Sequence, residues 1–355
     1  MLYFCRTKVN VFMHDCGLRD SLRFTEKILV IFPGALGDFI CFLPALGKLS
    51  RRGDVDLLAR SEYSEIVPPT VRVRSLERHE ITRLFVAESS RDEELKRLFD
   101  SYVAVYSWLG SSEPDFVNNL ETLTNGKLQI FSFRPSGSSM HMVDYCLSCL
   151  GEGDRGGAFP VVGLRSEAVS WAERFWRESG LEGRRVLALS PGSGAREKNW
   201  SIRSFQAVAE WWEKHCNGKV LVILGPVEEE REEIEHWDRF LAVRSLGLAK
   251  VAALLSRCNL YLGNDSGISH LAAALGVETL VLFGPTDPNE WAPRGKKVAV
   301  VRKAVECSPC TGPIMKACSH RKCLTQLPPE DVTGLLENLL DFKDLNAAAN
   351  PFSLV

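Results

Sequence analysis

The chain has 355 residues, with 45% hydrophobic and 25% charged side chains, which is the composition of a soluble globular protein. That length predicts two domains of roughly 150 residues each. The net charge of −2 gives no support for nucleic-acid binding, and no stretch reaches the roughly 18 apolar residues of a membrane span. Charged residues interrupt the N-terminal MLYFCRTKVNVFMHD, so we expect no signal peptide and a cytoplasmic protein.

The first half predicts an open parallel sheet preceded by an extension over residues 1–26. KILVIF at 27–32 is a buried strand, and a glycine-rich turn at 33–38 leads from it into a helix over about 39–49. Further strands are expected at 55–59, 83–86 and 103–105, and their alternation with helices favours a parallel sheet. The turn lacks the GxGxxG pattern of dinucleotide-binding proteins, so a dinucleotide oxidoreductase is the weaker alternative.

The second half repeats this pattern after a boundary between about 150 and 185. Helices are expected over 168–178 and after a cap at Ser201, with strands at 185–190, 219–224, 243–246, 259–263 and 279–283. We therefore predict an α/β protein with two Rossmann-like domains, over 27–165 and 185–335, which face each other across a ligand-binding cleft. Residues 336–355 are expected to form a tail that is loosely ordered from about 342.

The turn NDSG at 264–267 lies between a predicted strand and an Ala-rich helix over 268–275. The unpaired N–H groups at a helix start, together with the positive end of the helix dipole, bind anions and most often phosphate. Asp265 and Ser266 are also expected to cap this helix, which does not exclude binding. His270 lies one turn further along the helix, and a second polar turn follows the next strand, so we expect a binding site here.

Two further polar loops follow strands of the same sheet and therefore lie at its carboxyl edge. SPGSGAREKNW at 190–200 offers Ser193, glycines that let backbone approach an anion, and Lys198 as a compact cation for phosphate. At 225–229, a carboxylate just past a strand can accept hydrogen bonds from a ribose diol. A solvated lysine and an ordinary helix start are the alternatives for these loops. Together the three loops describe a nucleotide-diphosphate site.

The segments LGDFICFLPAL, LSPGSGAREKNW, LGPVEEE, NDSGISHLAAALG and LFGPTDPNEW together resemble glycosyltransferase family 9, the ADP-heptose:lipopolysaccharide heptosyltransferases. The resemblance covers about residues 27–335. It implies a GT-B fold, with the acceptor in the N-terminal domain and the nucleotide-sugar in the C-terminal domain. It also implies transfer with inversion and no required cofactor or catalytic metal.

Carried over by motif, Asp38 corresponds to the catalytic base of this family, and Gly37 lies beside it in the substrate-binding turn. A carboxylate within hydrogen-bond reach suits the removal of a proton from an acceptor hydroxyl. Capping of the helix that follows is the alternative role for Asp38.

The other implied contacts are those of the nucleotide-sugar. Lys198 and Ser193 correspond to the phosphate-binding loop, and Glu229 corresponds to the ribose-binding glutamate, with Glu228 one register away. The pyrophosphate turn and its helix correspond to Asp265, Ser266, Gly267 and His270; for His270, packing in the cleft wall is the alternative.

Eleven cysteines are many for a chain in which no disulfide framework is expected, and most are expected to be buried as small hydrophobes. Four of them lie within seventeen residues with His320 between them, and their spacing fits a structural zinc site: Cys307, Cys310, Cys318 and Cys323. Free or partly paired thiols are the alternative. Asp54-Val55-Asp56 imitates a DxD metal motif, but it stands at the start of a predicted strand and is interpreted as chance.

The resemblance implies an inverting glycosyltransferase that transfers heptose from ADP-heptose to a lipopolysaccharide inner-core acceptor. Because that acceptor is lipid-linked, we expect peripheral contact with the inner face of the membrane. A family member that uses another nucleotide-sugar or glycan acceptor is one alternative. A catalytically silent nucleotide-sugar binding protein is another, although the presence of both Asp38 and Lys198 argues against it.

Overall fold

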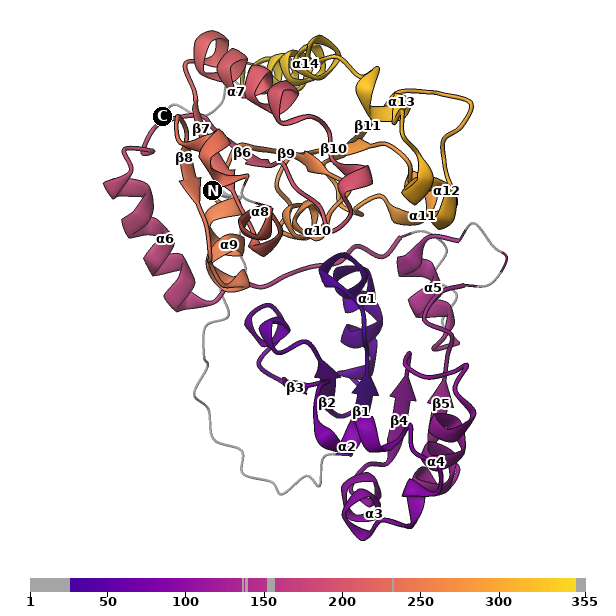
Figure 1. Ribbon diagram of the computed structural model, residues 1–355. Coiled ribbons are helices and arrows are strands. Elements are labelled where there is room, and N and C mark those ends of the chain that lie inside the picture. Colours follow the sequence, from indigo (N-terminus) through magenta and orange to yellow (C-terminus); the bar gives the residue numbers. More distant parts are fainter. Residues whose placement is uncertain (1–25, 136, 138–139, 152–156, 232, 349–355) are drawn as a thin grey trace.

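The computed structural model describes residues 26–135, 137, 140–151, 157–231 and 233–348. Within them, two parallel β-sheets carry helices on both faces (Figure 1). We call the first sheet with its helices α1–α5 the N-terminal lobe, and the second sheet with helices α6–α14 the C-terminal lobe. The α/β class and the two parallel sheets predicted from the sequence are confirmed, whereas the exact domain limits stay a prediction.

The N-terminal sheet has the strand order β3-β2-β1-β4-β5. Its strands are β1 (Lys27–Ile31), β2 (Asp54–Ala59), β3 (Val71–Ser75), β4 (Ala104–Ser107) and β5 (Leu128–Ile130). Its helices are α1 (Leu36–Leu49), α2 (His79–Arg83), α3 (Glu93–Asp100), α4 (Pro114–Thr124) and α5 (Met142–Ser148), with a 3-10 turn η1 (Ser61–Glu65) after β2 and another, η2 (Ser89–Arg91), before α3. Since β1 is buried from its second residue on, it forms the centre of this sheet.

The C-terminal sheet has the order β8-β7-β6-β9-β10-β11, which is the order of a Rossmann fold. Its strands are β6 (Val186–Ser190), β7 (Lys219–Ile223), β8 (Leu241–Val243), β9 (Leu260–Asn264), β10 (Thr279–Phe283) and β11 (Val298–Arg302). The strands β6, β7 and β8 follow one another toward one edge of the sheet, and β9, β10 and β11 follow one another toward the other edge, so the strand order reverses between β6 and β9. Ligands of this fold bind at that point.

The helices of the C-terminal lobe cover both faces of its sheet. They are α6 (Ser166–Glu178), α7 (Ile202–Cys216), α8 (Pro226–Glu230), α9 (Leu248–Leu255), α10 (Gly267–Ala274), α11 (Pro288–Trp291), α12 (Gly312–Ala317), α13 (Lys322–Thr325) and α14 (Pro329–Ala348), with 3-10 turns η3 (Arg196–Lys198) and η4 (Ile234–Trp237). The predicted cap of α7 is confirmed, because the Ser201 hydroxyl accepts the N–H of Ser204 at 3.0 Å. Helix α14 packs against α7 at the far end of the lobe (Figure 1).

Several expected boundaries were wrong. The strand expected at 83–86 is the end of α2 and a turn, in which Phe85 and Val86 are exposed. The third strand is instead β3, whose sequence VRVRS alternates as an edge strand with one exposed face should. Strand β5 was not predicted, and β8 ends where the strand at 243–246 was expected to begin. Helix α14 continues to Ala348 through the region expected to be a loose tail. Nearly all of the expected N-terminal extension lies outside the described residues.

The two lobes meet through α1 and α10, which pack against each other at the centre of the molecule (Figure 1). On one side of this contact, the Glu65 carboxylate accepts the N–H of Ala249 in the first turn of α9 at 2.8 Å. On the other side, the Arg294 guanidinium donates to both carboxylate oxygens of Asp144 in α5. These contacts hold the carboxyl edges of both sheets toward one another.

Candidate nucleotide-sugar site

Asp265 lies at the point where three loops of the C-terminal lobe converge. Its Oδ2 atom accepts a hydrogen bond from Lys198 Nζ at 2.8 Å and another from the Thr286 hydroxyl at 2.6 Å. Lys198 comes from the loop after β6, and Thr286 comes from the turn after β10. The predicted convergence of Lys198 and Asp265 is therefore observed, with Thr286 as a member of the cluster that the sequence motifs did not single out.

Helix α10 begins at this cluster with no side chain capping its N-terminus. Ser266 occupies the N-cap position, but its hydroxyl lies 3.3 Å from the Ser269 hydroxyl, and Asp265 is engaged by Lys198 and Thr286. The expectation that Asp265 and Ser266 cap this helix is therefore wrong as to their side chains. An uncapped helix start that faces a lysine is an anion-binding arrangement.

The loop over 191–200 is fixed by Asn264, the last residue of β9. Its amide accepts the N–H of Trp200 at 3.0 Å and donates to the Pro191 carbonyl at 2.6 Å, so it joins both ends of the loop. Asn264 is fully buried, and the turn motif did not indicate this role. The Ser193 hydroxyl donates to the Ala195 carbonyl at 2.7 Å and so shapes the same loop.

The two glutamates at the start of α8 have different surroundings. Glu228 is buried, and its carboxylate accepts the N–H of Gly225 at 2.7 Å, which caps the helix. Its pKa is raised mainly by burial. Glu229 instead accepts a hydrogen bond from the Ser245 hydroxyl at 2.5 Å, on the loop that leads into α9. Because Glu228 is used as a cap, Glu229 stays the predicted ribose ligand of the two.

Asp38 lies in the first turn of α1, three residues further into the helix than expected, because α1 begins at Leu36 rather than at about 39. Its carboxylate accepts the N–H of Ala35 at 3.2 Å, so it also helps to cap the helix. Burial raises its pKa, and the nearby Arg134 charge opposes that rise. A β-carbon at Gly34 would lie 2.7 Å from Asp38 Cβ, so a glycine is needed for this turn.

Arg134 is a site residue that the sequence motifs did not indicate. Its guanidinium lies 3.3 Å from Asp38 Oδ1 and stacks over the Trp291 ring, with 4.4 Å to the ring centroid. Trp291 ends α11 of the opposite lobe, so Arg134 links Asp38 to the C-terminal lobe. Together with Met140, Met142 and Glu290, Arg134 and Trp291 line a cavity of about 420 Å³ on the Arg134 side of Asp38.

Gly37 and Gly267 allow the two lobes to approach closely. A β-carbon at Gly267 would lie 2.7 Å from Leu36 Cβ, and one at Gly37 would lie 3.3 Å from the His270 ring. His270 is buried between the helices, where its Nδ1 lies 3.6 Å from Cys41 Sγ. Burial lowers its pKa to about 4, so this histidine is neutral and forms part of the cleft wall.

The carboxylate of the first lobe and the anion site of the second face the same space. Asp38 directly follows Gly37, and a β-carbon at Gly267 would lie 3.1 Å from the Gly37 backbone nitrogen, so Asp38 and Asp265 stand on adjoining backbone segments of the two lobes. The charges of Lys198 and Asp265 also act on the pKa of Asp38. A group bound at the start of α10 would therefore lie next to a carboxylate from the other lobe. That is the arrangement needed to remove a proton on one side of a reacting atom and to stabilise an anion on its other side.

The four clustered cysteines lie in the segment after β11. The thiols of Cys307, Cys310 and Cys318 all act on the pKa of Cys323, which is raised mainly by burial. Among the described residues, no three His, Cys, Asp or Glu side chains are arranged to hold a metal ion. The zinc prediction for these cysteines therefore stays a prediction. The DxD-like motif is structural, since Asp56 is buried and accepts the Tyr102 hydroxyl at 2.8 Å.

Comparison with known proteins agrees with this fold. In overall fold the chain is similar to the glycosyltransferase family 9 protein of Veillonella parvula, with a TM-score of 0.69, 20% identity, and coverage of 89% of this chain and 97% of that one. It is also similar to ADP-heptose lipopolysaccharide heptosyltransferase II of Escherichia coli, with a TM-score of 0.66, 18% identity and coverage of 90% and 99%. The two lobes therefore form a GT-B-like fold.

Sequence comparison gives the family. A model described as glycosyltransferase family 9 (heptosyltransferase) matches residues 163–319. Lipooligosaccharide heptosyltransferase 2 of Campylobacter jejuni is 29% identical over 174 residues, which are 44% of this chain and 52% of that protein. The matched region thus spans about half the length of this relative. Residues 163–319, which make up most of the C-terminal lobe, thus match glycosyltransferase family 9. None of the helices in the described part combines the length and hydropathy that a bilayer span requires.

Proposed function

We propose that this protein is an inverting glycosyltransferase that transfers heptose from ADP-heptose to a lipopolysaccharide inner-core acceptor. The observation that carries the proposal is the close packing of the start of α1, which carries Asp38, against the start of α10 beside the Lys198–Asp265 cluster of the opposite lobe. The family match and the names of the relatives, which are heptosyltransferases of lipooligosaccharide or of ADP-heptose and lipopolysaccharide, support the choice of donor and acceptor.

In the proposed reaction, an acceptor hydroxyl oxygen attacks the anomeric carbon of the donor sugar. Asp38 takes the hydroxyl proton as the new carbon–oxygen bond forms. The bond from the anomeric carbon to the diphosphate breaks, and its electron pair leaves with ADP. A single displacement inverts the configuration at that carbon. Burial suits Asp38 to this role, because a raised pKa makes the carboxylate a stronger base.

The charge that develops on the departing diphosphate would be held by Lys198 and by the N-terminus of α10. Lys198 would exchange its partner, since it is paired with Asp265 in the structure and would turn to a phosphate oxygen on binding. Glu229 would accept hydrogen bonds from the ribose diol. Lys198 and the N-terminus of α10 would supply the positive charge that a metal ion supplies in other transferases. We therefore propose that catalysis requires no metal or other cofactor.

The acceptor would bind on the Asp38 side, where Arg134 and Trp291 line the cavity of about 420 Å³. This assignment makes the N-terminal lobe the acceptor lobe and the C-terminal lobe the nucleotide-sugar lobe. A lipid-linked acceptor would bring the protein to the inner membrane surface through peripheral contact. The main alternative is a different nucleotide-sugar or a different glycan acceptor, because few of the residues named above would contact the sugar.

Two variants test the proposal. Asp38→Asn keeps the size of the side chain but removes the base, so transfer should fall at least 100-fold while the Kd for ADP changes less than twofold. Lys198→Ala should weaken ADP binding about tenfold or more, as expected when a charged hydrogen bond to phosphate is lost. Isothermal titration with ADP, UDP and GDP, and transfer from ADP-heptose, would be measured on the same preparations, with and without EDTA.

The outcomes separate the alternatives. Tighter binding of UDP or GDP than of ADP would favour another nucleotide-sugar. Nucleotide binding with no transfer to any core acceptor would favour the silent binding protein. Full transfer activity in Asp38→Asn would refute the assignment of the base, and loss of activity with EDTA that added metal restores would refute metal-independent catalysis.

A further inference from the structure

The cysteine-rich segment, residues 307–323, contacts one of the loops that hold the proposed donor. The Ser308 hydroxyl donates to the Gly284 carbonyl at 2.6 Å, and the Cys310 N–H donates to the Pro285 carbonyl at 2.7 Å. Gly284 and Pro285 begin the turn whose Thr286 hydroxyl is bonded to Asp265. The first part of the segment is therefore two hydrogen bonds away from the carboxylate that pairs with Lys198.

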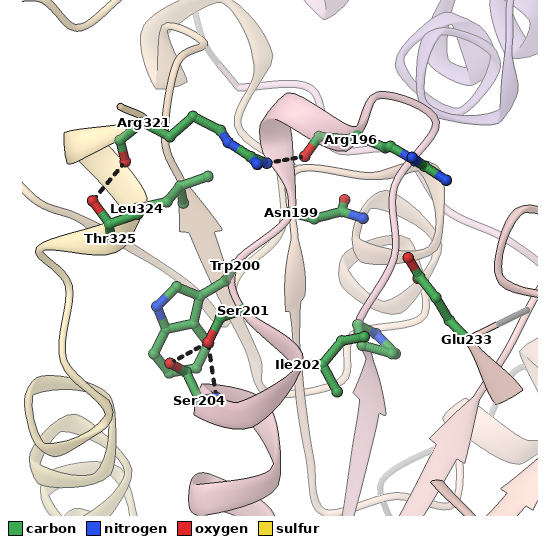
Figure 2. Close-up of a pocket in the computed structure, with 11 residues that line it drawn as sticks. Arg196, Asn199, Trp200, Ser201, Ile202, Ser204, Glu233, Arg321, Leu324 and Thr325 are labelled. Atoms are coloured by element: carbon green, nitrogen blue, oxygen red, sulfur yellow. Dashed lines mark hydrogen bonds between the residues drawn. The ribbon is translucent and has the colours of Figure 1, made fainter. Parts of the chain in front are cut away.

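The end of the same segment contacts the loop that carries Lys198. Arg321 reaches across the protein surface, and its Nη1 donates to the Arg196 carbonyl at 3.1 Å (Figure 2). That carbonyl also accepts the N–H of Asn199 at 3.1 Å, which closes the 3-10 turn η3 around Lys198. The guanidinium thus adds a second, charged donor to the oxygen that defines this turn.

Arg321 is itself held firmly in place. Its N–H lies 3.4 Å from Cys318 Sγ, and its carbonyl accepts from the Thr325 hydroxyl at 3.2 Å. Its φ angle is +42°, a left-handed conformation that residues with a β-carbon rarely adopt. The side chain spans one wall of a cavity of about 480 Å³ to reach Arg196, and the α7 N-terminus lines the opposite wall (Figure 2).

The hydrophobic core fixes the base of the segment. Cys323 and Leu324 are buried in the core of the C-terminal lobe, and Leu324 packs under Gly284 so closely that a β-carbon there would lie 2.6 Å from Leu324 Cγ. The segment therefore connects the core to two of the three loops around Asp265. A connection of this kind can transmit its own order to Lys198 without touching the ligand.

We propose that the cysteine-rich segment supports the donor site, and that Arg321 is a positioning residue that holds the η3 turn in the conformation in which Lys198 meets the diphosphate. This inference rests on the proposed function of Lys198. It gives the segment a role that depends on its hydrogen bonds and not on whether its cysteines bind a metal.

The test compares Arg321→Asn and Arg321→Gly by titration with ADP. Both variants remove the guanidinium, and both suit a left-handed backbone, so neither should impair folding. We expect the Kd for ADP to rise three- to tenfold in each, with kcat at saturating donor within twofold of wild type. Arg239→Asn is the matched control, because Arg239 is a surface arginine of the same lobe that pairs with Glu210.

A double-variant cycle with Lys198→Ala distinguishes positioning from a general loss of structure. If Arg321 acts through Lys198, adding Arg321→Asn to Lys198→Ala should change the Kd less than twofold further. Effects that multiply in the double variant would overturn the inference, as would a Kd unchanged in both single variants. Failure of the wild type to bind ADP would refute the proposed function as well, and so is a distinct outcome. A Kd for ADP that rises as much in Arg239→Asn as in the Arg321 variants would also contradict the positioning role of Arg321.

Discussion

Replacement of Arg134 by Gln should shift the pH dependence of transfer. The guanidinium lies 3.3 Å from the Asp38 carboxylate and is 49% exposed, so its charge acts largely through water. At a water-like dielectric constant this distance corresponds to about 1.3 kcal/mol. Arg134 lowers the pKa of Asp38, so its removal must raise that pKa further. Because the proposed base acts only when ionised, the acidic limb of kcat/KM should move to higher pH by about 0.9 unit.

The measurement is a pH profile of kcat/KM for wild type, Arg134→Gln and Arg134→Lys, between about pH 4 and 9. Arg134→Lys keeps the positive charge but has no planar group to stack on Trp291. The acidic limb of this variant should therefore stay near that of wild type, while the plateau value of kcat/KM falls. A limb that does not move in Arg134→Gln, or that moves to lower pH, would show that the Arg134 charge does not act on the catalytic base.

Three further predictions concern packing, protonation and the paired glutamates. Gly267→Ala should destabilise the protein by about 1–3 kcal/mol and weaken ADP binding, because its β-carbon would press on Leu36. Gly47→Ala is the control and should cause neither effect, because a β-carbon at Gly47 has nothing within 4 Å. Equal urea midpoints for the two variants would contradict the prediction. His270 has its pKa lowered to about 4 by burial, so the unfolded chain binds its proton first as the pH falls. Stability of up to about 3 kcal/mol should then be lost between about pH 6.5 and 4, and the urea midpoint of His270→Gln should depend less steeply on pH than that of wild type. Glu228→Ala should lower the melting temperature by removing the cap on Gly225, whereas Glu229→Ala should raise the Kd for ADP with little effect on melting; the reverse pattern would exchange their roles.

The parts of the fold that the sequence predicted are those in which burial and periodicity agree. Strands such as β1, β6 and β10 are almost wholly buried runs of aliphatic residues, and their boundaries were expected to within a residue or two. Edge strands were harder to find. In β3 only Val71 is buried, so its arginines obscured the alternation, while the apolar Phe85 and Val86 lie in an exposed turn and imitated a strand.

The site was predicted where a single loop carries several informative residues, and missed where the partners are distant in sequence. Lys198 and Asp265 each stand in a polar loop after a strand, so topology alone brings them together. Arg134 is 96 residues beyond Asp38 and follows a short strand that was not predicted, so no local pattern connects the two. The role of Asn264 was missed for the same reason, since its partners Trp200 and Pro191 are 64 and 73 residues away in the sequence.

The pairing of Lys198 with Asp265 has a consequence for how the donor would bind. With Asp265 already accepting the Thr286 hydroxyl, the carboxylate keeps one hydrogen bond when Lys198 turns away to a phosphate. The negative charge of Asp265 would then oppose a second anion nearby, so the diphosphate must gain enough from Lys198 and the start of α10 to exceed that repulsion. After transfer, the Asp265 carboxylate remains available to draw Lys198 back. Such a competing partner would weaken the binding of the product and would therefore favour release of ADP in the proposed reaction, once the bond to the sugar had broken.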